Sequence, residues 1–318
     1  MKKEGHQIVC LGGGTGLSTM LRGLKEHTEN LTAIVTVSDN GGGSGILRRE
    51  MNMLPPGDIR NCLLALAGTE PLMNQIFGHR FTEGSLEGQN LGNLFLAALT
   101  NILGSFELAV EKANEVLAVK GKVIPVTTAN VQLCALFDDG AQIEGETEIV
   151  ERCKVGRKSI QKVYLSPILP EAYDKAIQAL KEADTIVLGP GSLYTSIIPN
   201  LLVEGIAQTI RNSHAKVVYV SNIMTQPGET DHYTLKRHLD VIEEYLGKDV
   251  IDYIIVNDQE IDVEILYLYE KDSATQVIVD VVQDERLKVV RTSLAKINTE
   301  HGYIRHDPEQ LAEVIINL

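Results

Sequence analysis

The sequence predicts an α/β protein with a Rossmann-like, mostly parallel three-layer sheet, an inserted helical region and a small β-hairpin. Short apolar runs rich in β-branched residues alternate with helical stretches along the 318 residues, and glycine-rich turns follow several of these runs. Repeated strand–helix units form parallel sheets with helices on both faces. Such sheets bind ligands in the crevice at the carboxyl ends of their strands. The residues at those ends are therefore the candidates for the functional site.

The elements expected in the first half of the chain begin with a buried strand and a helix. A second strand and three mainly helical stretches follow. In order, we expect a strand at 7–11, a helix at 18–27, a strand at 31–37, helices within 59–68, 72–77 and 90–117, and a strand at 122–126. The helical stretches form an insertion at about 59–118 within a single domain that spans residues 1–318.

The second half opens with a hairpin, since Asp138-Asp139-Gly140 separates two apolar runs at 133–137 and 141–146. Strand–helix alternation then resumes. We expect helices at 171–183, 201–212, 233–246 and 308–317, strands at 185–188, 216–220 and 253–256, and short strands near 276–281 and 288–291.

Composition narrows the classes of function. Hydrophobic residues make up 44% of the chain, enough for a sizeable core, and 29 basic against 43 acidic residues give a net charge of -14. Such an acidic chain is a poor candidate for binding nucleic acid or anionic membranes. No apolar run approaches the about 20 residues of a membrane helix, and the four scattered cysteines suit a reducing compartment. We expect a cytoplasmic protein without membrane insertion.

The first glycine-rich turn follows the strand at 7–11. Glycines there bring bare backbone N–H groups close to a ligand, and the amino end of the next helix favours phosphate. A tight packing turn is the alternative, because the spacing lacks the third glycine of a dinucleotide motif and the lysine of a P-loop. The expected ligand-binding residues are Gly12, Gly13, Gly14, Thr15, Gly16, Leu17 and Ser18.

A second glycine-rich turn follows the strand at 31–37. Its Asp39 can hold a ribose hydroxyl, or Mg²⁺ beside a diphosphate, and the plainer alternative is a cap or an Asx turn. Gly43-Ser44-Gly45 is typical of a second anion-binding turn. The residues expected to bind ligand in this turn are Asp39, Asn40, Gly42, Gly43 and Ser44.

The third and fourth turns also precede helices. Asp58 after Pro55-Pro56-Gly57 either caps the next helix or faces the ligand. Arg60 stands where the helix dipole disfavours a cation, which favours a ligand role. Two asparagines three residues apart share a helix face and suit a nucleobase or a sugar, unless they serve as caps. The candidates are Gly57, Asp58, Arg60, Asn61, Asn90 and Asn93.

A fifth turn, Gly189-Pro190-Gly191-Ser192, follows the strand at 185–188, and Asn222 follows the next strand. Gly189, Gly191, Ser192 and Asn222 are therefore expected at the same edge of the sheet. Near the chain end, Arg305 reaches a phosphate or forms the surface salt bridge that is more common for arginine. Taken together, the five turns predict a nucleotide or another phosphorylated ligand.

No catalytic set accompanies these turns. Ser192 does not stand in a GxSxG elbow, and the eight histidines show no metal-ligand spacing. An oxidoreductase that uses NAD is the third hypothesis, ranked last because the dinucleotide motif is defective and no clear His or Tyr/Lys hydride partner appears. Binding without turnover is therefore the first hypothesis, and transfer chemistry is the alternative.

Six motifs in this order resemble the CofD-like family, and within it the gluconeogenesis factor (YvcK) branch. They are Gly-Gly-Gly-Thr-Gly-Leu-Ser at 12–18, Ser-Asp-Asn-Gly-Gly-Gly-Ser-Gly at 38–45, Pro-Pro-Gly-Asp-Ile-Arg-Asn at 55–61, Asn-Leu-Gly-Asn-Leu at 90–94, Pro-Val-Thr-x-x-Asn-Val-x-Leu at 125–133 and Gly-Pro-Gly-Ser-Leu-Tyr-Thr-Ser-Ile-Ile-Pro-Asn-Leu at 189–201.

The resemblance implies a Rossmann-like core with inserted helices. The founding members are 2-phospho-L-lactate transferases, which move a phospholactyl group from a guanosine-diphosphate-linked donor to a deazaflavin with Mg²⁺. The gluconeogenesis factors are bacterial cytoplasmic proteins linked to growth on gluconeogenic carbon sources, to cell shape and to the cell wall. For them the resemblance implies a UDP-sugar as ligand, with NAD as another occupant of the same crevice.

One departure from the transferase pattern concerns the first turn. The transferase branch carries a Lys or Arg shortly after the first Gly-x-Gly, where this chain has Leu17-Ser18-Thr19. The missing cation favours ligand binding over transfer. Asp39 and Asp58 match acidic positions of the transferase crevice, so they are the expected Mg²⁺ ligands. We expect a small-molecule nucleotide as partner, a homodimer as the oligomer, and no nucleic acid.

Overall fold

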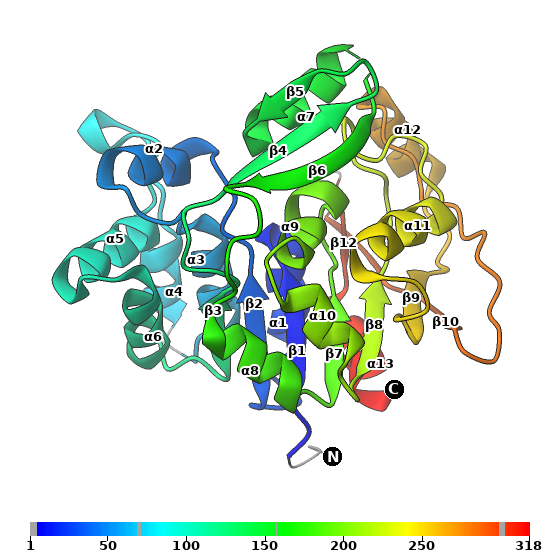
Figure 1. The fold of residues 1–318 in the computed structure, drawn as a ribbon, viewed down its shortest axis with the longest axis horizontal. Helices are drawn as coiled ribbons and strands as arrows, with labels where there is room; N and C mark the ends of the chain where they lie inside the picture. Colours follow the sequence, from blue (N-terminus) through cyan, green and yellow to red (C-terminus); the bar gives the residue numbers. More distant parts are fainter. Residues whose placement is uncertain (1–4, 69–70, 157, 299–302) are drawn as a thin grey trace.

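Seven strands form one sheet at the centre of the protein in the computed structural model, which describes residues 5–68, 71–156, 158–298 and 303–318 (Figure 1). The strand order is β10-β9-β8-β7-β1-β2-β3, and every neighbouring pair is parallel. This confirms the predicted α/β fold. The strands are β1 (Ile8–Gly12), β2 (Leu31–Val35), β3 (Lys122–Pro125), β7 (Thr185–Leu188), β8 (Lys216–Val220), β9 (Tyr253–Asn257) and β10 (Lys288–Thr292).

The order of the strands creates a switch point between β1 and β7. From β1 the chain moves outward through β2 to β3, and it later returns to β7 on the other side of β1. Cys10 in β1 pairs with Ala33 of β2 and with Val187 of β7, and all three strands are fully buried. Where the loops after two neighbouring strands run in opposite directions, a crevice opens between them at the carboxyl ends of the strands. The carboxyl ends of β1 and β7 are therefore the place to look for a ligand.

Helices cover both faces of the sheet (Figure 1). One layer contains α1 (Gly14–Leu24) together with α3 (Gly57–Leu66) and α13 (Pro308–Asn317), which both contact it. The other layer contains α8 (Asp174–Glu182), α10 (Ile206–Arg211) and α11 (Leu235–Leu246). Helix α1 begins at Gly14, four residues before the expected start, so the glycine-rich turn itself forms the first helical turn.

The helical insertion lies between β2 and β3. It contains α2 (Gly42–Met51), α3, α4 (Pro71–Gly78), the short 3₁₀ helix η1 (Gly84–Leu86), α5 (Leu91–Leu103) and α6 (Phe106–Val116). The expected stretch 90–117 is broken because Gly104 has φ +78 and ends α5, and Ser105 caps α6 by accepting from the backbone N–H of Leu108.

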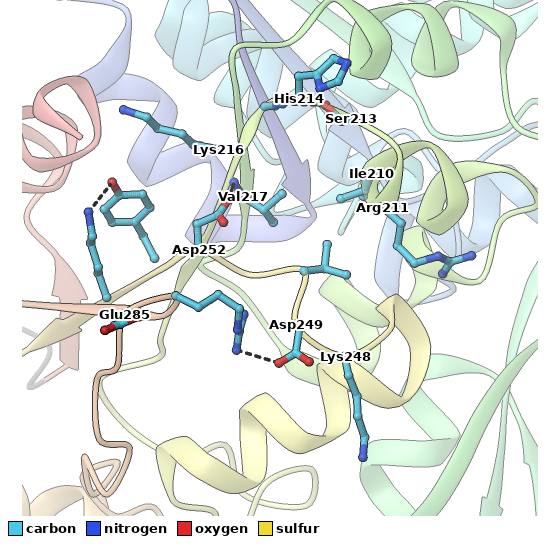
Figure 2. Close-up of a pocket in the computed structure, with 15 residues that line it drawn as sticks. Ile210, Arg211, Ser213, His214, Lys216, Val217, Lys248, Asp249, Asp252 and Glu285 are labelled. Carbon is cyan, nitrogen blue, oxygen red and sulfur yellow. Dashed lines mark hydrogen bonds and ion pairs between the residues drawn. The ribbon is translucent and has the colours of Figure 1, made fainter.

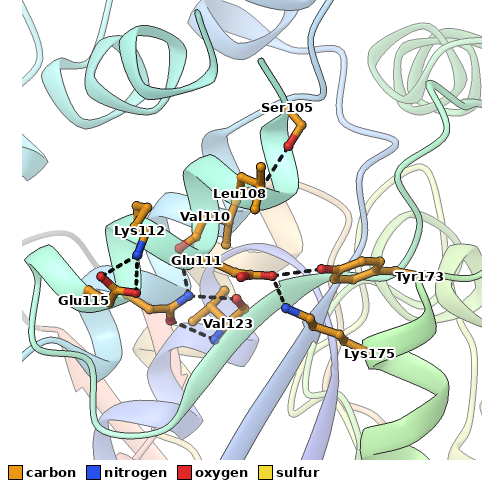
Figure 3. Close-up of polar contacts among 10 residues, drawn as sticks. Ser105, Leu108, Val110, Glu111, Lys112, Glu115, Val123, Tyr173 and Lys175 are labelled. Atoms are coloured by element: carbon orange, nitrogen blue, oxygen red, sulfur yellow. Dashed lines mark hydrogen bonds and ion pairs between the residues drawn. The ribbon is translucent and has the colours of Figure 1, made fainter. Parts of the chain in front are cut away.

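Polar contacts attach this insertion to the edge of the sheet (Figure 3). Asn114 of α6 donates to the carbonyl of Val123 in β3 at 3.1 Å and accepts from its N–H at 3.0 Å. Glu111 accepts a hydrogen bond from Tyr173 at 2.9 Å and pairs with Lys175 of α8. The bond from Lys175 lowers the pKa of Glu111. Helix α6 is thereby fixed to both β3 and α8.

A small antiparallel sheet lies above the carboxyl edge of the large sheet (Figure 1). It contains β4 (Gln132–Phe137), β5 (Gln142–Glu144) and β6 (Ile160–Ser166). Strands β4 and β5 form the predicted hairpin around Asp138-Asp139-Gly140. Strand β6 was not predicted from the sequence, and neither was α7 (Glu146–Gly156), which follows β5 directly.

The structure also corrects the later part of the chain. The expected strand at 276–281 is wrong, since only Gln276 forms a single bridge, to Met224. The expected helix at 201–212 is divided, and a π-helical turn precedes it. The observed elements are η2 (Leu193–Ile197), α9 (Ile198–Leu201) and α10, with the unpredicted α12 (Val263–Lys271), β11 (Ala295–Asn298) and β12 (Tyr303–His306) further on.

Within the described ranges, no single helix is long and apolar enough to cross a membrane. Helices α5 and α6 pass that test only as a pair, by length and composition, and they meet at an angle of 119°.

Candidate functional site

A cavity of about 520 Å³ opens at the carboxyl ends of β1 and β7, and we call it the β1/β7 crevice. The loops after three neighbouring strands form its floor, with carboxylates on one side and residues of the later chain on the other. Its lining includes Gly13, Gly14, Thr15, Gly16, Asp39, Asp58, Glu146, Pro190, Gly191, Ser192, Ser196, Asn222, Gln226, Tyr269, Asp272, Arg305 and His306.

The amino end of α1 faces this crevice. Gly13 is its N-cap, so no side chain of the cap closes the helix end, and the first turn holds no acidic residue. Gly14 has φ +61, a conformation that favours glycine. A Cβ on Gly16 would overlap the carbonyl oxygen of Pro190, so α1 touches the loop after β7 backbone to backbone. The crevice therefore has a helix amino end, which attracts anions, at its floor.

Asp58 reaches this helix end from α3. Its carboxylate accepts from the backbone N–H of Gly14, and α3 itself has no side-chain cap, so the capping interpretation of Asp58 is wrong. Burial, and then repulsion from Asp39, raises the pKa of Asp58 to about 7. Near neutral pH the carboxyl group is thus divided between its charged and neutral forms.

Asp39 forms the local turn that the sequence left open as an alternative. Its Oδ1 accepts from the backbone N–H of Gly41 at 2.8 Å. Burial raises the pKa of Asp39, against hydrogen bonds from Gly41 and Ser44 that lower it. Asp39 and Asp58 both line the crevice and also a second cavity described below, and we call this shared pair of carboxylates the carboxylate wall.

Two further carboxylates lie near this wall, and neither was predicted from the sequence. Glu229 is 8% exposed, and the hydroxyl of Thr195 donates to its Oε1 at 3.4 Å. Burial raises the pKa of Glu229 to about 7. Burial and repulsion from Asp39, Asp58 and Glu229 raise the pKa of Glu146 well above its usual value.

Local sequence explains why these two glutamates were overlooked. Glu146 was interpreted as the end of the hairpin strand but begins α7, and Glu229 lies in an irregular loop after β8 with no motif around it. Gln226 in the same loop donates to Ser192 Oγ at 2.6 Å. Among the described residues, no group of three or more His, Cys, Asp or Glu is arranged to hold a metal ion.

The second cavity, of about 270 Å³, shares the carboxylate wall with the crevice, and we call it the α2/α3 pocket. It is lined by Asp39, Gly41, Gly42, Gly43, Ser44, Gly57, Asp58, Arg60, Asn61, Arg80 and Asn93. Two of its lining residues are arginines. Nη2 of Arg60 donates to Asn61 at 2.6 Å, whereas Nε and Nη1 are buried and have no acceptor within the described chain.

Most of the sequence-predicted residues line one of these two cavities. Those in neither are placed as follows. Leu17 and Ser18 are buried in α1, Gly12 ends β1, and Gly189 adopts φ +79. The side chain of Asn40 donates to Glu148 at 2.7 Å, and that of Asn90 caps α5. For Asn90 the structure therefore shows the plainer alternative.

A larger cavity of about 730 Å³ lies at the opposite edge of the sheet (Figure 2). Its lining includes Lys216, Tyr253 and Lys288, the first residues of β8, β9 and β10. Two of its arginines have partners, since Arg286 pairs with Asp249 at 3.0 Å and Arg211 donates to the carbonyl of Leu246 at 2.9 Å. Ligands of open parallel sheets bind at the carboxyl ends, so this cavity is the weaker candidate.

The fold and the crevice define the class of protein: a doubly wound α/β protein with a crevice at its switch point. The family model described as 2-phospho-L-lactate transferase CofD matches residues 8–295. The chain is 45% identical to a protein of Bacillus subtilis named gluconeogenesis factor, over 98% of both chains. A relative of the same name from Halalkalibacterium halodurans is 43% identical over 99% of this chain and 97% of its own.

A solved structure shows the same fold. The crystal structure of a UPF0052-family protein from Bacillus halodurans is 41% identical, with a TM-score of 0.91 over 98% of this chain and 99% of that one. The chain therefore belongs to the CofD family, among the relatives named gluconeogenesis factors, as the six motifs predicted.

Proposed function

We propose that this protein binds a nucleoside-diphosphate-linked ligand of the UDP-sugar type in the β1/β7 crevice. The observation that carries the ligand class is the amino end of α1, which has a glycine N-cap and opens on a cavity of about 520 Å³. That volume lies within the range of about 300–1,000 Å³ typical of small-molecule sites.

The diphosphate would lie on α1 and the loop after β7. Gly14 and Gly16 belong to the helix end, and Gly191 faces them from the other strand. Arg305 is the one arginine or lysine among the described residues that line the crevice. Asn222 and Gln226 offer amides for the base or the sugar. Backbone N–H groups thus replace most of the cations that an acidic chain does not provide here.

Asp39 and Asp58 fit a Mg²⁺ ion bound together with the diphosphate. Mg²⁺ in nucleotide sites is held by one or two carboxylates, phosphate oxygens and waters, so it needs no larger cluster of acidic groups. Both carboxylates line the crevice. The ion would supply charge neutralisation, while these two residues hold it beside the helix end.

Binding would serve a regulatory role rather than turnover. The name of the relatives, gluconeogenesis factor, supports a role in growth on gluconeogenic carbon sources. Effects on cell shape and cell-wall integrity belong to the same proposal, because UDP-sugars are wall precursors. The second candidate is a Mg²⁺-dependent transferase, which the description of the family model and the pair of half-buried carboxylates favour.

Calorimetry with UDP-N-acetylglucosamine, UDP-glucose and NAD, each with and without MgCl₂, tests the ligand. We expect saturable binding of a UDP-sugar that Mg²⁺ strengthens. Absence of binding by any UDP-sugar would contradict the proposal. Binding of NAD alone would show that the ligand is a dinucleotide and not a UDP-sugar. Release of a nucleoside monophosphate from a donor panel would instead establish the transferase.

Replacing Arg305 by glutamine should weaken UDP-sugar binding by about ten-fold, because a charged hydrogen bond to phosphate contributes roughly 1.5 kcal/mol. The affinity for uridine, which lacks phosphate, should stay the same. Lys248→Gln is the matched control, since Lys248 lines the cavity at the opposite edge of the sheet. Equal affinity of the Arg305 variant and the unmodified protein for UDP-sugar would show that Arg305 does not contact the diphosphate.

A further inference from the structure

The α2/α3 pocket is lined by two arginines, Arg60 and Arg80, although the chain as a whole has a net charge of -14. Arg60 projects from the first turn of α3, and Arg80 comes from the loop after α4. Burial lowers the pKa of Arg60 and the nearby positive charge of Arg80 lowers it further, whereas the carboxylates of Asp58 and Asp39 raise it. The two guanidinium groups are therefore close enough to repel each other.

Some hydrogen-bond donors of Arg60 have no acceptor among the described residues. One of its nitrogens donates to Asn61, while Nε and Nη1 are buried without an acceptor among the described residues. A buried donor without a partner typically costs about 1–3 kcal/mol, and more for a charged group. An anion in the pocket would supply the missing acceptors and would reduce the repulsion from Arg80.

Close packing against α5 holds the Arg60 side chain at the pocket. A Cβ on Gly92 of α5 would lie 2.9 Å from Cδ of Arg60 and 2.6 Å from the carbonyl oxygen of Phe77. Only a residue without a side chain fits where the arginine crosses α5. On the far wall, Asn93 donates to Ser44 Oγ at 3.4 Å, and both side chains are buried. Helix α2 begins at this wall without a side-chain cap.

The geometry points to a second, separate anion site: we propose that the α2/α3 pocket binds the phosphate or carboxylate group of a small second ligand. Its volume of about 270 Å³ is close to half the 520 Å³ of the β1/β7 crevice, so the ligand is small. Asp39 and Asp58 line both this pocket and the β1/β7 crevice, whereas Arg60 and Arg80 line this pocket alone. The site needs no nucleotide in the crevice, and the two ligands can be bound together.

Titration of the full chain with inorganic phosphate and with acetate, each with and without saturating UDP-N-acetylglucosamine, tests this site. Calorimetry measures affinity, and thermal unfolding shows the accompanying rise in Tm. We expect the unmodified protein to bind at least one of these anions whether or not the nucleotide is present. The two probes distinguish a phosphate site from a carboxylate site. No binding of either anion up to about 50 mM overturns the proposal.

Three variants locate the anion. Arg60→Gln and the exposed Arg80→Gln should each lose anion affinity at least ten-fold more than UDP-sugar affinity, whereas Lys248→Gln at the opposite edge should match the unmodified protein. Because Arg80 is exposed, its variant tests the site even if Arg60→Gln does not fold.

Equal losses of anion and UDP-sugar affinity would assign both arginines to the nucleotide and overturn the second site. Anion binding that depends on Arg60 without any nucleotide binding would sustain the site and contradict only the proposed function.

Discussion

Gly16→Ala is expected to reduce UDP-sugar affinity by at least a hundred-fold. A Cβ at this position would overlap the carbonyl oxygen of Pro190 and lie 2.8 Å from its carbonyl carbon and 3.2 Å from Cα of Gly191. All three are backbone atoms, so no side chain can rotate away. Helix α1 and the loop after β7 would have to separate, and the N–H groups expected to converge on the diphosphate would diverge. Overpacking of this kind also lowers stability by about 1–3 kcal/mol.

Gly78→Ala is the matched control for Gly16→Ala. Gly78 is the last residue of α4, nothing lies within 4 Å of a Cβ built there, and its φ is not positive. Alanine should be neutral or slightly stabilising at this position. Calorimetry with UDP-N-acetylglucosamine and thermal unfolding of both variants check the result. Unchanged affinity in Gly16→Ala would show that the contact of α1 with the loop after β7 does not form the ligand site.

All seven strands of the large sheet were predicted from the sequence, for a physical reason. Strands of a central parallel sheet are buried on both faces and therefore appear as continuous apolar runs, such as Thr185–Leu188 and Tyr253–Asn257. Strand β6 was missed because its exposure varies along its length and polar residues interrupt its apolar positions. Helix α2 was missed because its first four residues are all glycine or serine, which are poor helix formers.

The candidate site was predictable where glycine marks a strand end. Gly13–Gly16 and Gly191 line the crevice because turns of this kind must follow parallel strands and open helices. Contacts between distant segments were not predictable. The repulsion between Arg60 and Arg80, and that between Glu146 and Glu229, depend on how loops fold over the sheet edge. No local pattern encodes such pairs, so the four carboxyl groups around the crevice became visible only in the structure.

Glu229→Gln is expected to stabilise the ligand-free protein at pH 8 and to have little effect near pH 4.5. Burial raises the pKa of Glu229 from 4.5 to about 7. In the unfolded chain this carboxyl ionises at the lower pH, whereas the folded protein keeps it neutral until the pH reaches about 7. The unfolded state therefore binds fewer protons between these values, and stability falls as the pH rises through this window. The gap corresponds to roughly 3 kcal/mol.

Glutamine should remove this pH dependence because it cannot ionise, and its amide oxygen can still accept from Thr195. Urea unfolding of the ligand-free protein at pH 4.5, 6 and 8 measures the effect, with the exposed Glu313→Gln on α13 as the control. If Glu229→Gln were equally destabilising at all three pH values, the carboxylate would be charged and paired in the folded state. The expected gain at pH 8 would instead show that the protein retains a destabilising acid beside the crevice, which a role in ligand binding would explain.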